Sequence, residues 1–431
     1  MRRGSILLLT LAAAYAPSVA YANGRFPRAQ QIVIDPADEN HLALRATFGV
    51  TVTHDGGKSW SWLCEEAMGF SGAWDPPIAF GNDGSLLIGL TDGLVSTRDA
   101  CTMQRSMKGQ LVSDLSRAPD GDLVATSTAS DPAKLWRRGK DGRSSPLGKG
   151  IAGVYLDTVD AAPSKPSRVY ATGVQIGEPP EAHLFVSDDG GATLKEVTPV
   201  LPTRGRLFLA AVDPHDPMHL FVRQLGEKGS DLLVSGDGGH SFAVALHMDG
   251  AMYGFAMDAS GNDLWVGSAD ESQGIWASHN GGVTFAQAAK VIVYCLARSG
   301  STLYVCSEPF RPGGYAVGVS HDDGATVTPL ATFADVTGPI SCDAGDGVRC
   351  QGDAWSKMHA TLMTASPKTA SALDAGEADA SMVLAHDDEA PVKPSRCLCE
   401  TSVPRADRWG VYAALLAFAI FVSRRARWIA R

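Results

Sequence analysis

Histidine and acidic side chains recur along this sequence, but their spacing does not build a catalytic or metal-binding motif. One eight-residue turn has histidine at its second position in three places, at His54, His279 and His321. Copies of a turn on different repeats lie far apart, so we expect these histidines to be exposed to solvent. His215 and His219 have the i, i+4 spacing of a metal pair, which requires a helix, whereas Pro217 predicts a strand connection. The sequence therefore predicts no metal site and no cofactor.

The turn that carries these histidines occurs seven times and determines the expected fold. Five copies follow the pattern Ser/Thr-x-Asp/Asn-x-Gly-x-Thr/Ser, usually with an aromatic residue next, and we name them box turns. Their acidic or amide residues are Asp55, Asp189, Asp237, Asn280 and Asp322. Two eroded copies begin at Ser96 and Arg138. The seven starts lie 42 to 49 residues apart, which is the repeat length of a propeller blade.

Each complete box turn is preceded by two segments of alternating apolar and polar residues, for example 31–35 and 41–45. The 46 glycines and 24 prolines favour short strands and turns over long helices. Together with the two strands joined by each box turn, these segments give four strands per repeat. The sequence therefore predicts an all-β fold, a seven-bladed β-propeller of four-stranded antiparallel blades over residues 23–353.

The box turn resembles the Asp-box, so the domain resembles the Asp-box (BNR-type) propellers, a group that includes sialidases, sortilin-type receptors, xyloglucanases and photosystem II assembly factors. In such a turn the carboxylate accepts hydrogen bonds from backbone N–H groups and glycine supplies a left-handed conformation. Calcium binding by these side chains is an alternative. The resemblance implies a fold and no particular activity, because the motif lies at the blade periphery in families of unrelated function.

A sialidase activity would require three arginines converging on a carboxylate beside a Tyr/Glu nucleophile pair. The sequence has Arg25-Phe-Pro-Arg28 in place of the expected Phe/Tyr-Arg-Ile-Pro, and its other candidates lie on different blades, at Arg45, Arg206, Arg223 and Arg298. We therefore expect a non-enzymatic binding or scaffold module for a protein or glycan outside the cell. An exo-glycosidase of sialidase type is the alternative, and an assembly-factor-like propeller for a membrane complex is a third.

Exposed aromatic and arginine residues dominate binding hot spots, which suggests where the ligand would bind. The chain path places the box turns on one face of the ring and the interblade loops on the other, at the mouth of the central channel. The candidate contact residues in those loops are Trp74, Arg206, Phe310 and Arg311.

Eight cysteines in an exported chain predict disulfides. A two-residue turn at Gly300-Ser301 places Cys295 opposite Cys306, within disulfide distance. Two further bonds are expected, one between Cys342 and Cys350 across a short loop, and one, by elimination, between Cys64 and Cys101.

The two ends of the chain predict export and anchoring. Residues 1–22 have two arginines, an apolar stretch and a final Ala-Tyr-Ala, as a signal peptide does. Residues 354–408 are expected to form a flexible linker rich in Ala, Asp, Ser and Pro. The uncharged residues 409–423 predict a short transmembrane helix, and the arginines of 424–431 predict a cytoplasmic end.

Cys397 and Cys399, the apolar stretch and the arginine cluster follow one another in the order of the MYXO-CTERM tail of myxobacterial surface proteins, which this end resembles. The resemblance implies processing near a cysteine by a sorting protease and display on the cell surface. A plain single-pass anchor is the alternative. The net charge of −10, with no basic block in the middle of the chain, excludes a nucleic-acid partner.

Overall fold

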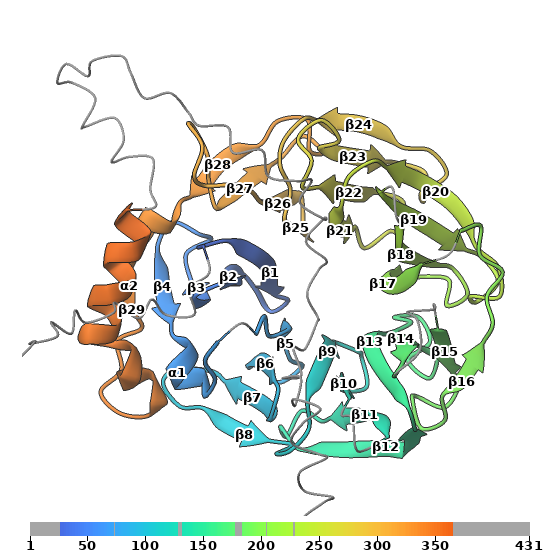
Figure 1. The fold of residues 1–431 in the computed structure, drawn as a ribbon, viewed down its shortest axis with the longest axis horizontal. Helices are drawn as coiled ribbons and strands as arrows, with labels where there is room; N and C mark the ends of the chain where they lie inside the picture. Colours follow the sequence, from blue (N-terminus) through green and yellow to red (C-terminus); the bar gives the residue numbers. More distant parts are fainter. Residues whose placement is uncertain are drawn as a thin grey trace, which may run out of the picture. The chain divides into compact units, whose positions relative to one another are not determined.

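Short strands joined by glycine-rich turns form a ring of seven sheets around a central channel in the computed structural model (Figure 1). The structure describes residues 26–364, apart from 73, 128–131, 177–182, 204 and 227–228. Every sheet contains four consecutive antiparallel strands, so the predicted seven-bladed propeller of four-stranded blades is confirmed. Within each blade the first strand lies next to the channel and the fourth at the outer rim.

The strands are β1 (Ala29–Asp35), β2 (Asp38–Ala46), β3 (Gly49–Thr53) and β4 (Trp60–Leu63) in blade 1; β5 (Ile78–Phe80), β6 (Leu86–Leu90), β7 (Gly93–Thr97) and β8 (Gln104–Ser106) in blade 2; β9 (Val112–Ser116), β10 (Asp122–Thr126), β11 (Ala133–Arg138) and β12 (Ser144–Ile151) in blade 3; β13 (Val154–Ala161), β14 (Val169–Gln175), β15 (His183–Ser187) and β16 (Lys195–Val197) in blade 4; β17 (Arg206–Val212), β18 (Leu220–Gly226), β19 (Gly229–Ser235) and β20 (Ala243–Met248) in blade 5; β21 (Met252–Met257), β22 (Leu264–Ser268), β23 (Ile275–Ser278) and β24 (Ala286–Ala289) in blade 6; and β25 (Cys295–Ser299), β26 (Thr302–Cys306), β27 (Val317–Ser320) and β28 (Thr328–Ala331) in blade 7.

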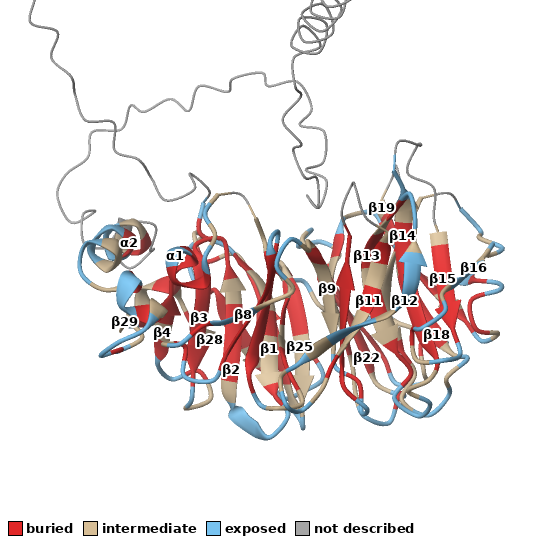
Figure 2. Ribbon diagram, turned by 90° about the horizontal axis from the view of Figure 1, so that it is seen from below, coloured by how far each residue is buried: buried red, intermediate tan, exposed pale blue. Residues whose placement is uncertain are grey.

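Most strand residues are buried (Figure 2). Their apolar side chains form clusters that join neighbouring blades, for example blades 3 and 4. Each complete box turn packs against the preceding blade. At Gly57, for example, an added Cβ would lie 2.6 Å from Leu330 Cδ2 of blade 7, and the backbone has a positive φ of 72° at Gly56 and 93° at Gly57. A side chain at Gly57 would therefore separate two blades, which explains why the repeat requires glycine there.

The ring closes by a segment that we name the clasp, residues 332–364. After blade 7 the chain passes through the 3₁₀ helix η1 (Phe333–Asp335) to β29 (Val336–Pro339), which pairs in parallel with β4, placing Val336 opposite Trp60. Blade 1 thereby has a fifth strand. The clasp continues through η2 (Asp346–Cys350) and α2 (Asp353–Thr364), whose Met358 and Leu362 are buried in the core that includes blade 1.

Two disulfides join the clasp to the ring. Cys350 bonds to Cys64, beside α1 (Glu65–Met68), and Cys342 bonds to Cys101 of blade 2. The predicted pairs Cys342–Cys350 and Cys64–Cys101 are therefore wrong. Because β29 pairs with β4, the two clasp cysteines lie beside blades 1 and 2. Each therefore bonds to a cysteine of the ring and not to the other clasp cysteine.

The third predicted disulfide, Cys295–Cys306, is confirmed, with the two cysteines opposite each other on β25 and β26 and 4.8 Å between their Cα atoms. The predicted start of the flexible linker needs a correction. Residues 354–364 belong to α2, because Met358 and Leu362 give this Ala-rich and Ser-rich segment an apolar face that packs on the core.

The two eroded turns also differ from their predicted alignment. In blade 2 Asp99 accepts hydrogen bonds from Thr97, Cys101 and Thr102, so the turn begins at Thr97 and lies one residue later than predicted. In blade 3 the first position is Arg138, whose buried guanidinium binds Asp83 at 2.8 Å and Asp122 at 3.4 Å. An ion pair between blades 2 and 3 thus replaces the hydroxyl of a box turn.

Within residues 26–364 no helix is both long enough and apolar enough to span a bilayer. The predicted signal peptide, the linker beyond residue 364, Cys397 and Cys399, the predicted helix at 409–423 and the arginine-rich end lie outside the described residues.

Candidate functional site

The two faces of the ring carry different kinds of loop. The box face carries the box turns and the turns between first and second strands, and the loop face carries the interblade loops and the turns between second and third strands. All four residues predicted to contact a ligand, namely Trp74, Arg206, Phe310 and Arg311, belong to loop-face segments or to a strand end there.

The structure does not gather these four residues into one pocket. Trp74 lies between blades 1 and 2 and donates its indole N–H to the carbonyl of Gly89 at 3.0 Å. Arg206 begins blade 5 and forms a two-pronged ion pair with the buried Asp157. Both side chains therefore have partners within the protein, and only Phe310 and Arg311 of blade 7 are neighbours of each other.

A group of aromatic and charged residues surrounds Phe310, and we name it the aromatic cluster. Phe26, which is 73% exposed, packs edge-to-face on Phe310 with 4.9 Å between ring centroids. The Arg28 guanidinium lies 4.5 Å from the ring centre of Tyr294, whose hydroxyl donates to Glu308 at 2.9 Å. Sequence reasoning found Phe310 and missed the others. Tyr253 and Tyr294, whose rings are 6.4 Å apart, lie at or before the starts of neighbouring inner strands β21 and β25, a signal that could have revealed them.

The central channel contains a cavity of about 270 Å³ that shares Tyr253 with this cluster. The guanidinium of Arg223 stacks 4.7 Å from the ring centre of Phe208 and donates to the Met252 carbonyl at 2.6 Å. Arg223 Nε and Gln30 Oε1 are buried and have no hydrogen-bond partner among the described residues.

Three carboxylates line up on the inner strands of blades 3 and 4, at Asp114, Asp157 and Asp160. Burial raises the pKa of Asp114 to about 7 and that of Asp160 to about 6, despite hydrogen bonds from Val159 N–H and from the Ser116 hydroxyl. Since Asp114 on β9 accepts from β13, its carboxyl group joins blade 3 to blade 4. This arrangement supports the ring and does not form a reactive pair.

Tyr294 and Glu308 resemble the residue types of a sialidase nucleophile pair. Burial and the hydrogen bond to Glu308 together raise the pKa of Tyr294 to about 12, although Arg28 acts in the opposite direction. The phenolate is therefore disfavoured, whereas a nucleophilic tyrosine requires the reverse. Arg45, one of the arginines considered for a carboxylate site, instead donates to the carbonyls of Asp75 and Pro76. Arg206 and Arg223, expected on different blades, both belong to blade 5.

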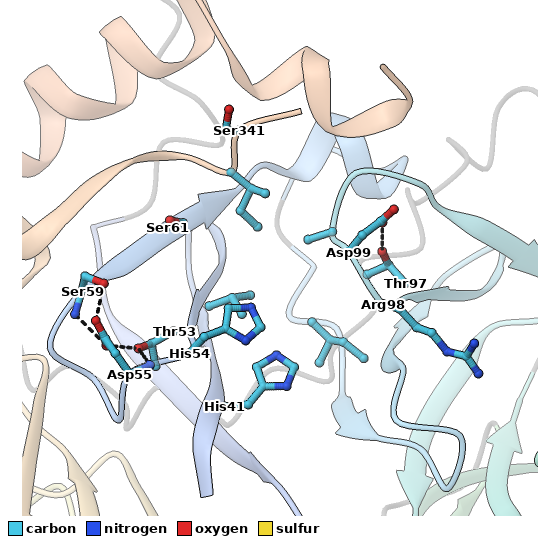
Figure 3. A pocket seen from close by; sticks show the side chains of 14 residues that line it. His41, Thr53, His54, Asp55, Ser59, Ser61, Thr97, Arg98, Asp99 and Ser341 are labelled. Atoms are coloured by element: carbon cyan, nitrogen blue, oxygen red, sulfur yellow. Dashed lines mark hydrogen bonds between the residues drawn. The ribbon is translucent and has the colours of Figure 1, made fainter. Parts of the chain in front are cut away.

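On the box face a second cavity, of about 250 Å³, lies between blades 1 and 2 (Figure 3), and we name it the rim cleft. His54 and His41 stack there with ring centroids 4.1 Å apart, and His41 lies 4.6 Å from the ring of Phe80 in blade 2. The His41 Nδ1 is 3.1 Å from the carboxylate of Asp35. His54 thus differs from His279, which hydrogen-bonds Asp263 at the rim of blade 6.

Box carboxylates are held by their own turns. Asp55 accepts from the hydroxyls of Thr53 and Ser59 and from two backbone N–H groups, and these bonds hold its pKa far below the usual range. Equivalent bonds lower the pKa values of Asp189 and Asp322 to about 2. Asp237 and Asn280 bind their turns in the same way. Among the described residues, no three His, Cys, Asp or Glu side chains are grouped so that they could hold a metal ion.

Comparisons with known proteins show only similarity in fold. No family model and no curated protein sequence matches the chain. Among solved structures, the chain is similar to the extracellular domain of a hybrid two-component system from B. thetaiotaomicron, at 11% identity and TM-score 0.49 over 70% of this chain and 39% of that one. It is also similar to Kuenenia stuttgartiensis hydrazine synthase (13%, TM-score 0.48, 68% and 96% covered) and to YCF48 bound to D1 peptide (14%, TM-score 0.45, 68% and 93% covered).

The chain therefore spans well under half the length of the first of these structures. Likenesses at this level say nothing of a ligand or an activity, and the seven-bladed architecture rests on the sheet topology itself.

Proposed function

We propose that this protein is an exported propeller that binds a protein or glycan ligand on its loop face, at the channel mouth, without catalysis. One observation carries the proposal: the aromatic cluster presents the exposed ring of Phe26 and guanidinium of Arg28, supported by the half-buried Phe310 and Tyr294, and Tyr253 next to Tyr294 lines the channel cavity. Large amphipathic side chains of this kind supply most of the binding energy of protein surfaces.

The neighbouring charges fit a binding surface. Arg311 forms a two-pronged ion pair with Glu271, with N–O distances of 2.8 and 3.1 Å, and both side chains are more than 40% exposed. Such a pair at the edge of the aromatic cluster contributes little to stability, since exposed ion pairs are screened by water. It can instead exchange its partners for those of a ligand, as rim charges do in interfaces.

Further parts of the proposal rest on the sequence. The box turns support membership of the Asp-box propellers. The signal-like residues 1–22 support export, and the tail from Cys397 to residue 431 supports a membrane-anchored, MYXO-CTERM-like surface protein processed by a sorting protease. Mass spectrometry of the surface form tests the tail: a mature chain that still ends at Arg431 contradicts proteolytic sorting.

Ligand screening on the full chain tests the binding proposal, with a glycan array and with proximity labelling at the cell surface. For the ligand found, we expect the double variant Arg28→Ala, Tyr294→Ala to weaken binding at least tenfold. Arg143→Ala is the control, since Arg143 is 91% exposed at a distant turn. Unchanged affinity in the double variant would place the ligand elsewhere and refute the channel-mouth site.

The alternative, an exo-glycosidase of sialidase type, is favoured by one observation, the hydrogen bond between Tyr294 and Glu308. Release of 4-methylumbelliferone from its sialoside measures this activity directly. We expect no turnover above that of the Tyr294→Phe variant. Turnover that Tyr294→Phe removes would replace the binding proposal by an enzymatic one.

A further inference from the structure

We propose that the rim cleft between blades 1 and 2 is a second binding site, for a neutral saccharide of one or two sugar rings. This site lies on the box face and shares no residue with the channel mouth, so it stands independently of the function proposed above. The argument starts from the stacked rings in the cleft and proceeds to the polar groups around them.

The wall of the cleft contains two stacked imidazoles, His41 and His54, and behind them lies the buried ring of Phe80 from blade 2, tilted by 60° to His41. The ring centroids of Phe80 and His41 are 4.6 Å apart and those of the two imidazoles are 4.1 Å apart, and the two imidazoles are within 20° of parallel. His54 is the outermost ring and is exposed to solvent. Burial and the neighbouring His41 both lower the pKa of His54, which keeps the ring uncharged at neutral pH. An uncharged flat ring, supported from behind, is a surface on which the apolar face of a pyranose stacks.

Hydrogen-bonding groups surround this stack (Figure 3). Ser61 of blade 1 and Ser341 of the clasp line the cavity. On the opposite wall the Thr97 hydroxyl donates to Asp99, whereas the guanidinium of Arg98, 68% exposed, points away from the histidines and lies 3.5 Å from Asp83 (Figure 3). Polar residues of the clasp, blade 1 and blade 2 therefore line the cavity. Sugar hydroxyls, which both donate and accept, match such a mixed set.

Charge and size decide among the possible ligands. The walls include Asp55 and Asp99 as well as Arg98, and Arg98 is already 3.5 Å from Asp83, so the cleft does not favour an anion. The oxygens of Asp55 are taken by turn donors, which disfavours a metal ion. The volume of about 250 Å³ lies just below the range of roughly 300–1,000 Å³ that is typical of drug-sized ligands, so the cleft fits a small ligand rather than a folded protein.

The cleft exists because this junction departs from the repeat. The turn of blade 2 has Ala100 and Cys101 where a box turn has two glycines, and it begins one residue later in the chain than the repeat spacing predicts. The disulfide between Cys101 and Cys342 fixes the clasp beside this turn and brings Ser341 to the opening. The site is thus assembled from two irregular parts of the chain and held by a covalent bond.

A glycan array of neutral mono- and disaccharides, probed with the full chain, tests the proposal, and titration calorimetry with the strongest neutral saccharide measures the affinity. We expect His54→Ala to weaken this affinity at least tenfold and His54→Phe, which keeps a ring, to retain it within threefold. The matched control is His279→Ala, because His279 has the same position in the box turn of blade 6 and does not line the cleft. It should bind as the unmodified protein does.

Three outcomes would overturn the proposal: an array without any neutral saccharide signal, equal affinity of His54→Ala and His279→Ala, or loss of binding in His54→Phe. Equal unfolding temperatures of the three variants verify that the fold is intact. Tyr294→Ala separates the two sites, since saccharide binding that is lost in this variant and kept in His54→Ala belongs to the channel mouth and refutes the cleft.

Discussion

The junction between blades 1 and 2 and the junction between blades 3 and 4 are built from the same repeat and held in different ways. At the first, the clasp adds a fifth strand and two disulfides. At the second, the rim has a cavity of about 330 Å³ lined by Leu135, Leu147 and Leu194 and by glycine backbone. Both junctions have an open pocket at the rim, the rim cleft at the first and this cavity at the second, and only the first has covalent bonds beside it.

The last residue of the box turn differs between blades, and because each box turn packs against the preceding blade, Trp60 lies at the junction of blades 7 and 1 and Leu194 at that of blades 3 and 4. In blade 1 it is Trp60, which is 2% exposed and donates its indole N–H to the Gly57 carbonyl at 3.0 Å. In blade 4 it is Leu194, which is only partly buried. The smaller side chain leaves a space next to Gly148, where an added Cβ would lie 1.8 Å from the carbonyl oxygen of Ala192. The backbones are thus in contact there although the side chains do not fill the rim.

Among the changes considered, removing a clasp disulfide should cause the largest loss of unfolding free energy. Cys64 and Cys350 are 286 residues apart, but the Cys101–Cys342 bond already closes 241 of these residues. The additional loop of about 45 residues restricts the unfolded chain by about 4 kcal/mol in the chain-entropy description. We therefore expect the double variant Cys64→Ala, Cys350→Ala to lose about 4 kcal/mol of unfolding free energy, measured by urea denaturation.

The matched control is Cys295→Ala with Cys306→Ala, which opens a loop of only 11 residues separation within one hairpin and should cost about 3 kcal/mol. If the hairpin variant loses as much as the clasp variant, the clasp is not a special stabilising element of the first junction.

At the junction of blades 3 and 4, the contribution of Asp114 to the unfolding free energy should depend on pH. The pKa of Asp114 is about 7 in the fold and near its ordinary value in the unfolded chain, so its stabilising contribution is complete below about pH 4 and is lost as the pH rises through 7. Asp114→Asn cannot ionise and keeps an acceptor for Val159 N–H. Allowing for partial solvent contact of this side chain, we expect the variant to be more stable than the unmodified protein by about 2 kcal/mol at pH 8.

At pH 4 the two proteins should unfold at the same urea concentration. Asp141→Asn, at an exposed turn, controls for loss of a negative charge. If Asp114→Asn differs from the unmodified protein by the same unfolding free energy at pH 4 and at pH 8, Asp114 does not ionise across this range.

Filling the rim pocket should have the smallest effect and the opposite sign. Leu194→Phe gives blade 4 the residue type that box turns usually have, and we expect a gain of about 1 kcal/mol, as for other cavity-filling substitutions. Val327→Phe is the matched control, since Val327 has the same box position and already lies close to the backbone of Gly318. It should destabilise the protein through overpacking. Thermal unfolding measures both, and a loss in Leu194→Phe would mean that the pocket cannot accept a ring.

The repeat made the fold predictable, because each box turn is a local pattern whose spacing counts the blades. The same locality explains the success with Cys295 and Cys306, which face each other across a single hairpin. The other two disulfides depend on the pairing of β29 with β4, in which Val336 lies opposite Trp60, about 276 positions earlier in the sequence. No local sequence pattern predicts that contact.

The candidate sites were less predictable for a related reason. Phe310 was found as an aromatic residue in a loop, whereas its contact Phe26 lies just before the first strand and outside the repeat. The rim cleft depends on an irregular turn in blade 2 and on Ser341 of the clasp. An alignment of the repeats places the blade 2 turn one residue too early, and the clasp lies outside the repeats. Binding features thus occur where the chain departs from its own repeat.

The clasp also determines how the ring bears mechanical load. A pull on the chain beyond residue 364 first extends α2, and it then reaches Cys350, which is bonded to Cys64 at the end of β4. From there the force passes into the first blade through a covalent bond, so β29 cannot be peeled from β4 hydrogen bond by hydrogen bond. With the clasp oxidised, the seven blades would resist tension applied to the tail as one unit.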